Sequence, residues 1–145
     1  MSTESCPLPS DSPGVEAAAV DRMLKAKRVA IVGMSDDPDR PSHDIGGYLI
    51  AHGYEVIPVN PNHQEVLGRK WYASLADVPG TIDMVNVFRR PEFCADVAHQ
   101  AIAAGAKGVW LQAGIRNEQA QRLAIEAGID FVQDRCIMVE HMQQR

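Results

Sequence analysis

Arg28-Val29-Ala30-Ile31-Val32, followed by Gly33-Met34-Ser35, is the stretch of sequence that decides the fold. An apolar, β-branched run that ends in glycine is typical of the first buried strand of a parallel sheet. The carboxyl end of such a strand opens onto a crevice where ligands bind. The dinucleotide pattern G-x-G-x-x-G does not follow this strand. The stretch therefore predicts a Rossmann-like sheet whose ligand is held by a different loop.

The rest of the chain repeats strand–helix units. Three predicted helices end in a small residue and Gly, and apolar strands follow at 54–59, 108–111 and 129–132. Glycine after a helix takes the left-handed conformation that closes the last turn. A further strand at 84–88 precedes Pro91, which is well suited to open a helix. Helices are also expected at 15–26, after Ser42, after a cap at Asn117, and at 139–143.

These repeated units predict the fold class and the domain organisation. The class is α/β, with a single Rossmann-like, doubly wound sheet of about five parallel strands and helices on both faces. A chain of 145 residues is one ordinary domain, too short for a nucleotide domain with a separate substrate domain. Residues 1–14, rich in Ser and Pro, are expected to form a flexible leader, and residues 15–145 the domain.

The net charge and the cysteines indicate which binding partners and which cellular compartment suit the protein. The net charge is −5, from 14 basic and 19 acidic residues, so no basic stripe is expected and nucleic acid is an unsuitable partner. Cys6, Cys94 and Cys136 are odd in number and have no C-x-x-C spacing, which favours reduced thiols. The sequence shows neither a targeting segment nor a run long enough to span a bilayer. We therefore expect a soluble, cytoplasmic protein that does not enter membranes.

Four loops follow the predicted strands and should meet at one edge of the sheet: 33–42, 60–62, 88–91 and 112–115. In the first loop, Gly33 lets backbone approach a ligand, Ser35 offers a hydroxyl, and Arg40 offers a planar fork for phosphate oxygens. Ser42 is expected to cap the next helix, whose N–H groups would then face an anion. The loop predicts a phosphate site, with ordinary turn, cap and surface roles as an equally weighted alternative.

Nearby side chains bear on this site. Asp36, Asp37 and Asp39 argue mildly against phosphate and would have to point outward. Arg89 and Arg90, at the end of a buried strand, suit a phosphorylated ligand, although one of them is expected to be solvated. Trp71 and Tyr72 could stack on adenine, but aromatic residues in a connecting segment more often anchor it to the core.

Other chemistries fit the sequence less well. A conventional NAD site needs an acidic residue after the second strand, where this chain has Asn60-Pro61, so an NAD(P)-linked oxidoreductase domain is only the alternative. Gly33-Met34-Ser35 begins like a G-x-S-x-G nucleophile elbow, but Asp37 stands at the last glycine. A P-loop is missing, and the dispersed histidines indicate no metal site. Cys136 could be a reactive thiol beside Arg135, with a packed thiol the preferred interpretation.

A set of motifs, taken in order, resembles the small stand-alone CoA-binding domain proteins. The match covers nearly everything after Gly14. The family is similar in fold to the CoA-binding amino-terminal domain of the succinyl-CoA synthetase alpha subunit. The motifs are Gly33-x-Ser35, Arg40-Pro41-Ser42, Gly53-Tyr54-x-Val56, Pro58-Val59-Asn60-Pro61, Val87-Phe88-Arg89, Gly105-Ala106-Lys107-x-Val109-Trp110-x-Gln112-x-Gly114 and Asp134-Arg135-Cys136.

The resemblance implies non-covalent binding of coenzyme A, or of an acyl-CoA, without catalysis. It implies a pyrophosphate site near Gly33, Ser35 and Arg40. It implies an adenine side near Asn60 and Pro61, and a pantetheine path past Phe88, Arg89 and Gly114. It implies neither catalytic nor metal-ligating residues. An acyl-CoA enzyme as partner and self-association are left open. The full set of expected ligand contacts is Gly33, Met34, Ser35, Arg40, Ser42, Asn60, Pro61, Phe88, Arg89, Gln112 and Gly114.

Overall fold

A computed structural model describes residues 13–35, 37, 39–60, 65–66 and 68–144. Its centre is a five-stranded sheet in the order β2-β1-β5-β6-β7, in which every neighbouring pair is parallel. This order confirms the predicted doubly wound sheet. The strands are β1 (Arg28–Val32), β2 (Glu55–Val59), β5 (Met84–Val87), β6 (Gly108–Leu111) and β7 (Asp130–Val132).

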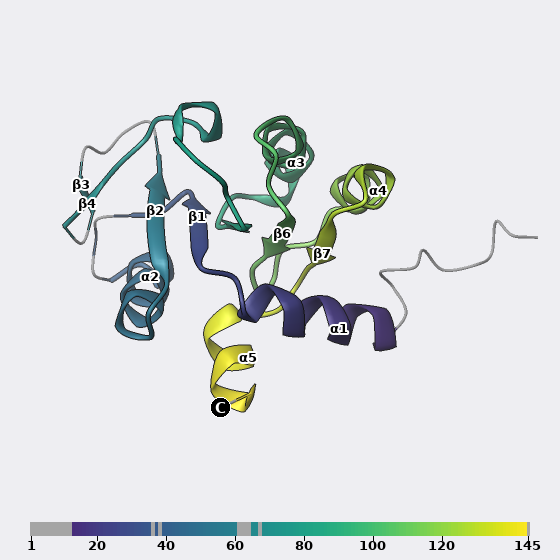
Figure 1. Ribbon diagram of the computed structural model, residues 1–145, viewed down its shortest axis with the longest axis horizontal. Helices are drawn as coiled ribbons and strands as arrows, with labels where there is room; N and C mark the ends of the chain where they lie inside the picture. The colour runs from purple at the N-terminus through teal and green to yellow at the C-terminus, as the bar shows by residue number, and fades with distance from the viewer. Residues whose placement is uncertain (1–12, 36, 38, 61–64, 67, 145) are drawn as a thin grey trace, which may run out of the picture.

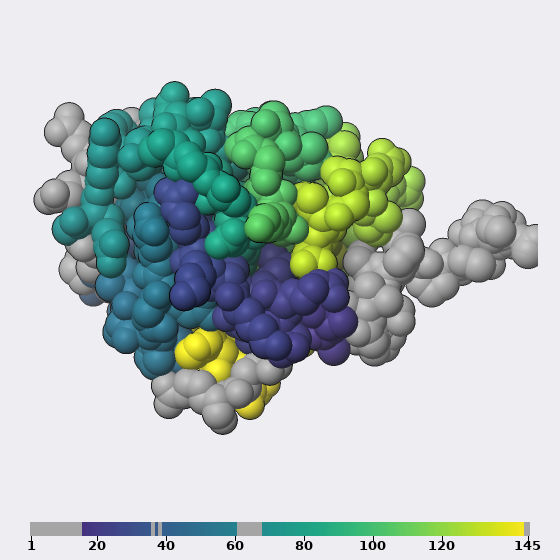
Figure 2. Space-filling view, viewed as in Figure 1, coloured from purple at the N-terminus to yellow at the C-terminus, as the bar shows by residue number. Residues whose placement is uncertain are grey.

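Helices cover both faces of this sheet (Figure 1). On one face lie α1 (Pro13–Leu24), α2 (Pro41–Ala51) and α5 (Ile137–Gln144), and on the other lie α3 (Cys94–Ala103) and α4 (Glu118–Ala127). Figure 2 shows α1 in purple lying against the yellow-green β7 segment. Helix α1 begins two residues before the expected start, and residues 1–12 of the predicted leader lie outside the described residues.

The core divides into two layers because successive side chains of a strand point to opposite faces. In β6, Val109 packs into the layer under α3 and α4, whereas Trp110 packs into the layer under α1, α2 and α5. The Trp110 ring is fully buried, and its Nε1–H donates to the Arg135 carbonyl at 2.8 Å. The sheet is therefore buried on both sides, and only its strand ends can meet a ligand.

The ends of α4 follow the sequence prediction. Asn117 caps this helix, since its Oδ1 accepts a hydrogen bond from the Ala120 N–H at 2.8 Å. Gly128 ends it with φ 75°, in the left-handed conformation. Pro91 opens a 3₁₀ turn, η4 (Pro91–Phe93), which leads directly into α3. These residues set where α3 begins and where α4 begins and ends, and so set the lengths of the adjoining loops.

The segment after β2 contains structure that the sequence did not predict. Strands β3 (Glu65–Val66) and β4 (Arg69–Lys70) form an antiparallel pair, and a 3₁₀ turn, η3 (Leu75–Asp77), follows. Tyr72 lies between β4 and η3. Its N–H donates to Pro58 O at 3.0 Å, and the Asn60 N–H donates to Tyr72 O at 2.9 Å. Tyr72 also packs against the core, which confirms that it anchors the segment.

Asp83 ties the beginnings of β1 and β5 together at the amino edge of the sheet. Its Oδ2 accepts from the N–H groups of Lys27 and Arg28 at 3.1 and 3.0 Å. Burial acts to raise the pKa of Asp83, but these two donors, with the charges of Lys107 and Arg28, outweigh it and lower that pKa. The carboxylate is thus held in its charged form by the fold.

The substitution Asp83→Asn tests this tie. Because the pKa is lower in the folded state, the carboxylate adds stability above its unfolded pKa and loses it as the pH falls through the folded pKa. At neutral pH we expect Asp83→Asn to lower the free energy of unfolding by about 1 kcal/mol, allowing for partial exposure. Urea unfolding from neutral to acidic pH should show this difference shrinking toward zero, whereas the exposed Asp21→Asn control should differ little at any pH. A difference that grew in acid would contradict the assignment.

Candidate functional site

The order in which the chain adds strands to the sheet reverses between β1 and β5. From β1 the chain passes through α2 to β2 on one side, and then crosses to β5 on the other side. The carboxyl ends of β1 and β5 therefore meet where the two halves of the sheet part, which is where open α/β sheets bind ligands. The Phe88 N–H donates to Val32 O at 2.9 Å and closes the sheet at this point.

Gly33 occupies this junction with a backbone that only glycine adopts readily. Its φ is +86°, and a Cβ placed on it would lie 2.6 Å from the Phe88 carbonyl oxygen. The Gly33 N–H donates to Val59 O at 2.9 Å, so the residue also ties β1 to β2. Its bare backbone forms the boundary between two cavities at the sheet edge.

The first cavity, here called the cradle cavity, measures about 400 Å³ and lies on the α2 side of Gly33. It brings together six of the residues predicted to contact a ligand. It is open and mixed in character, with hydroxyl groups, a guanidinium and an amide beside one aromatic ring. Its lining residues are Gly33, Ser35, Asp37, Arg40, Pro41, Ser42, Asn60 and Phe88.

The predicted cap at Ser42 is wrong. Pro41 fixes a helical φ and starts α2 two residues earlier than a cap at Ser42 would, so Arg40 is the N-cap and caps without its side chain. Ser42 lies inside the first turn, buried, and its Oγ accepts from the Ser35 N–H at 3.0 Å. Ser42 thus shapes the loop, and the Arg40 side chain makes no cap bond that a ligand would have to break.

One acidic residue of this loop borders the cavity. Asp37 is exposed, as expected, and is one of the residues that line the cradle cavity. Its N–H donates to Ser35 Oγ at 3.0 Å, and its own Oδ1 accepts from the Asp39 N–H at 3.0 Å. Asp39 is exposed, and Asp36 lies outside the described residues. An anionic ligand would therefore have to accommodate one carboxylate.

Asn60 joins the loops that follow β1 and β2. Its Nδ2 donates to the Met34 carbonyl at 2.9 Å. An amide donor engaged in this way does not replace the acidic ribose acceptor of an NAD site. The Met34 side chain is buried and contacts the α2 backbone at Gly46, so only its backbone borders the loop. Pro61, the other predicted contact here, lies outside the described residues.

Arg89 follows the end of β5, in a bend, and does not line the cradle cavity. It lines a second cavity of about 220 Å³ on the α3 side of Gly33, here called the α3 cavity. Its Cζ lies 4.6 Å from the centroid of the Phe93 ring, and that of Arg90 lies 5.4 Å away. Sequence reasoning missed this cavity, since its other walls come from the segment before η3, from η4 and from α3. The remaining lining residues are Val32, Gly33, Val59, Ala73, Ser74, Phe93, Asp96, Val97 and Gln100.

Gln112 and Gly114 follow β6 and do not line either cavity. Gln112 is buried, and its Oε1 accepts from Asn86 Nδ2 at 3.2 Å and from the Ile137 N–H at 3.1 Å. The Gly114 N–H donates to Asp134 Oδ1 at 2.7 Å. Both polar groups thus make internal hydrogen bonds, and their predicted contact with a ligand stays a prediction.

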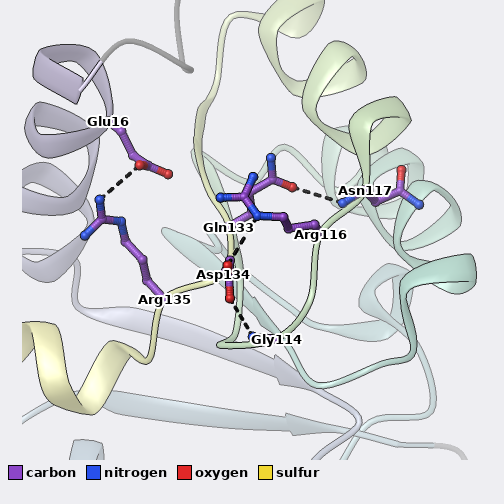
Figure 3. A network of polar contacts seen from close by, with 7 residues as sticks. All are labelled: Glu16, Gly114, Arg116, Asn117, Gln133, Asp134 and Arg135. Atoms are coloured by element: carbon purple, nitrogen blue, oxygen red, sulfur yellow. Dashed lines mark hydrogen bonds and ion pairs between the residues drawn. The ribbon is translucent and has the colours of Figure 1, made fainter.

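Asp134 fastens the loop after β6 to the loop after β7 (Figure 3). It has φ 58°, a left-handed conformation that Asp tolerates better than most residues. The hydrogen bond from Gly114, followed by that from Arg116, lowers the pKa of Asp134 below its ordinary value. Gln133 Oε1 accepts from the Asn117 N–H at 3.0 Å, and Arg135 pairs with Glu16 at 3.1 Å. The motif Asp134-Arg135 therefore connects its own loop to the loop after β6 and to helix α1.

Among the described residues, the Cys94 thiol is not activated and no cluster typical of a metal centre is found. Burial, opposed by the charge of Arg89, raises the pKa of the Cys94 thiol to about 11, which keeps it protonated. Its Sγ lies within hydrogen-bond distance of the Arg90 carbonyl, at 3.6 Å. Across the described ranges, no three His, Cys, Asp or Glu side chains gather as a metal site would require. Nor does any described helix have the length and apolar content needed to cross a membrane.

Comparison with known proteins identifies the family of this domain. Residues 27–142 match the model of the CoA binding domain family. The chain belongs to this CoA-binding domain family. It is 44% identical to YneT of Bacillus subtilis over 119 residues, 82% of this chain and 88% of YneT. The structure of a protein from Pyrococcus horikoshii OT3 matches with a TM-score of 0.85 and 39% identity, over 96% of this chain and 97% of that one.

The CoA-binding domain also occurs in larger relatives. The alpha subunit of an ADP-forming acetate–CoA ligase of Pyrococcus furiosus is 29% identical over 91 residues, which are 62% of this chain and 20% of that subunit. The chain thus corresponds to about a fifth of the ligase subunit, and its full length is matched by small proteins instead. The resemblance to CoA-binding domains of acyl-CoA synthetases is confirmed, and the NAD(P) alternative is not favoured.

Proposed function

We propose that this protein binds coenzyme A, or an acyl-CoA, reversibly and without catalysing a reaction on it. The observation that carries the proposal is the cradle cavity at the switch of strand order, which joins Ser35, Arg40 and Asn60 around the bare backbone of Gly33. Hydroxyl, guanidinium and backbone donors are the groups that hold a diphosphate. Membership of the CoA-binding domain family supports CoA as the molecule that carries it.

The absence of an acidic residue after β2 also supports CoA. Asn60 stands where NAD sites place an acceptor for the ribose hydroxyls. The ribose of CoA carries a 3′-phosphate, which a carboxylate at that point would repel. The protein therefore lacks the group that would favour NAD and disfavour CoA.

Calorimetric titration of the full chain tests the proposal. CoA should bind saturably, dephospho-CoA more weakly, and NADH or NADPH more weakly than CoA. Absence of binding heat at millimolar CoA would overturn the proposal. Prolonged incubation with acetyl-CoA should release no free thiol beyond the protein-free rate, and measurable turnover would refute the non-catalytic assignment.

Arg40→Ala should weaken CoA binding about tenfold, the effect of losing one charge-assisted hydrogen bond to phosphate. The substitution should leave α2 intact, because Arg40 caps that helix without using its side chain. Arg122→Ala, at an exposed position of α4, is the matched control and should bind CoA as the unaltered protein does. Equal affinities for the two variants would remove Arg40 from the site.

The ligase relatives support an acyl-CoA enzyme as the partner of this small domain. In this proposal, the bound CoA is the signal or the ligand that such an enzyme receives. Affinity capture with and without added CoA should then show a partner that depends on the ligand.

A further inference from the structure

A hollow of about 330 Å³, here called the amino-edge hollow, lies at the edge of the sheet where the strands begin. Lys27 precedes β1, Lys107 precedes β6, and Asp130 begins β7. The last turn of α1, which lies beside β7, forms another wall (Figure 1). Because β1 is five residues long, about 16 Å separates this edge from the loops that follow the strands.

The amino-edge hollow carries an excess of positive charge. Four of its lining side chains are cationic and two are anionic, although the whole chain has a net charge of −5. A partner with a negative surface is therefore attracted to this region of a protein whose overall charge would repel it. The charged lining residues are Arg22, Lys25, Lys27, Asp83, Lys107 and Asp130.

The two carboxylates of the hollow are already engaged by the fold. Arg22 Nη2 donates to Asp130 Oδ1 at 2.6 Å, and Arg22 Nε donates to Asp130 Oδ2 at 3.1 Å. Asp83 accepts from the backbone N–H groups of Lys27 and Arg28. Neither carboxylate depends on a lysine side chain, so the ammonium groups are the ones that an incoming acid would meet.

The lysine side chains around the hollow are held weakly. Lys107 Nζ lies 3.8 Å from Asp83 Oδ1, and 71% of the Lys107 side chain is exposed. Lys25 Nζ lies 3.4 Å from Asp21 Oδ2, outside the hollow, and its side chain is 75% exposed. The Lys27 side chain is exposed and forms no ion pair within the described part of the chain. Because exposed pairs contribute little, the carboxylates of a partner can recruit all three ammonium groups at small cost.

The backbone of the hollow favours a protein partner over a free phosphate. The Lys27 N–H donates to Asp83, and the Lys107 N–H donates to Ile82 O at 3.3 Å. The Asp130 N–H donates to Lys107 O at 3.1 Å. Helices α3 and α4 also end at this edge, and their carbonyl ends disfavour a small anion seated close to the backbone. Long ammonium side chains instead suit carboxylates that a partner presents from outside.

We propose that the amino-edge hollow is a docking surface for an acidic segment of a partner protein, whose carboxylates meet Lys25, Lys27 and Lys107. Opposite edges of the sheet then serve the ligand and the partner. A partner docked here does not cover the cradle cavity or the α3 cavity. The proposal does not depend on which ligand the other edge binds.

The test titrates the isotope-labelled full chain with a blocked hexaglutamate peptide at low ionic strength and follows the backbone amide signals by NMR. Binding should saturate, with the largest shifts at residues 25–27, at Asp83 and at Lys107. Raising the ionic strength to about 0.15 M should weaken binding several-fold, because charges are then screened beyond about 8 Å. Titration without saturation, or largest shifts in another region, would overturn the proposal.

A pair of double variants separates the hollow from the overall charge. Lys27→Gln with Lys107→Gln should weaken hexaglutamate binding about tenfold, since two charge contacts are lost. Both side chains are exposed and the backbone hydrogen bonds stay, so this variant should fold. Lys70→Gln with Arg122→Gln removes the same charge at exposed positions elsewhere and should bind the peptide as the unaltered protein does. Equal losses in the two double variants would refute a local docking surface.

Inorganic phosphate and a second copy of the chain are the other occupants to compare. Phosphate at matched ionic strength should not displace hexaglutamate, and phosphate binding as tight as that of the peptide would contradict a protein partner. Self-association that Lys27→Gln with Lys107→Gln abolishes would assign the hollow to a second copy and would also overturn the proposal. Both double variants should keep the CoA affinity of the unaltered protein, so this test is independent of the proposed function.

Discussion

Gly33→Ala is expected to lower the free energy of unfolding by about 3 kcal/mol, combining a left-handed alanine with an overpacked contact. The added methyl group would lie 2.6 Å from the Phe88 carbonyl oxygen, which belongs to the backbone and cannot rotate aside. Relief requires the ends of β1 and β5 to separate, where the Phe88 N–H bonds to Val32 O. CoA binding should fall in parallel, because both cavities share this backbone.

Gly128→Ala is the matched control for Gly33→Ala. Gly128 has φ +75°, but no atom lies within 4 Å of the position of its Cβ. This substitution should cost only about 1 kcal/mol, the conformational term alone. Urea unfolding measures both values, and calorimetry at a temperature where both variants are folded measures CoA affinity. Equal costs for the two glycines would show that the close approach of β5 does not constrain Gly33.

Gln112→Leu is expected to destabilise the fold by about 3 kcal/mol, because it removes the acceptor of two buried donors. The Ile137 N–H at the start of α5 and the Asn86 amide both donate to Gln112 Oε1. The Asn86 side chain is fully buried and its Oδ1 has no hydrogen-bond partner in the structure, so the whole amide would be left unpaired. The loss of stability measures the structural role of Gln112, which is separate from the ligand contact predicted from the sequence.

A double-mutant cycle sharpens this second prediction. In the Gln112→Leu background, Asn86→Leu removes the unpaired amide and should recover part of the lost stability, whereas the same change alone should destabilise. Gln119→Leu, at an exposed position of α4, controls for the loss of an amide at the surface. Additive effects of the two core substitutions in urea unfolding would contradict the paired arrangement.

Local sequence signals predicted the elements well, because each depends on a few neighbouring residues. The apolar run at Val29–Val32, the cap at Asn117 and the glycine stop at Gly128 each have a local physical cause, and the structure has all three. The pair β3–β4 was missed because its strands are two residues long and lack an apolar pattern. The predicted cap at Ser42 was wrong because Pro41 takes the first helical position, which makes the preceding Arg40 the cap.

The candidate site was predictable only as a set of loops. Their meeting at one sheet edge follows from parallel strands, and Gly33, Arg40 and Asn60 do line one cavity. Side-chain direction does not follow from loop position. Arg89 lies in a bend after β5 and lines the α3 cavity, and Gln112 is held inside by partners far along the chain. Asp134 had one local signal, its tolerance of left-handed backbone, but no sequence pattern gives its bond to Gly114.

The hydrogen bonds drawn in Figure 3 reduce the conformational entropy that the loops can lose when a ligand binds. Asn117 Nδ2 donates to the Pro91 carbonyl at 2.8 Å, so bonds through Asn117, Gln133 and Asp134 connect the loops after β5, β6 and β7. These three loops are preorganised before any ligand arrives. A ligand that contacts these connected loops therefore costs less conformational entropy than one that must first order separate loops.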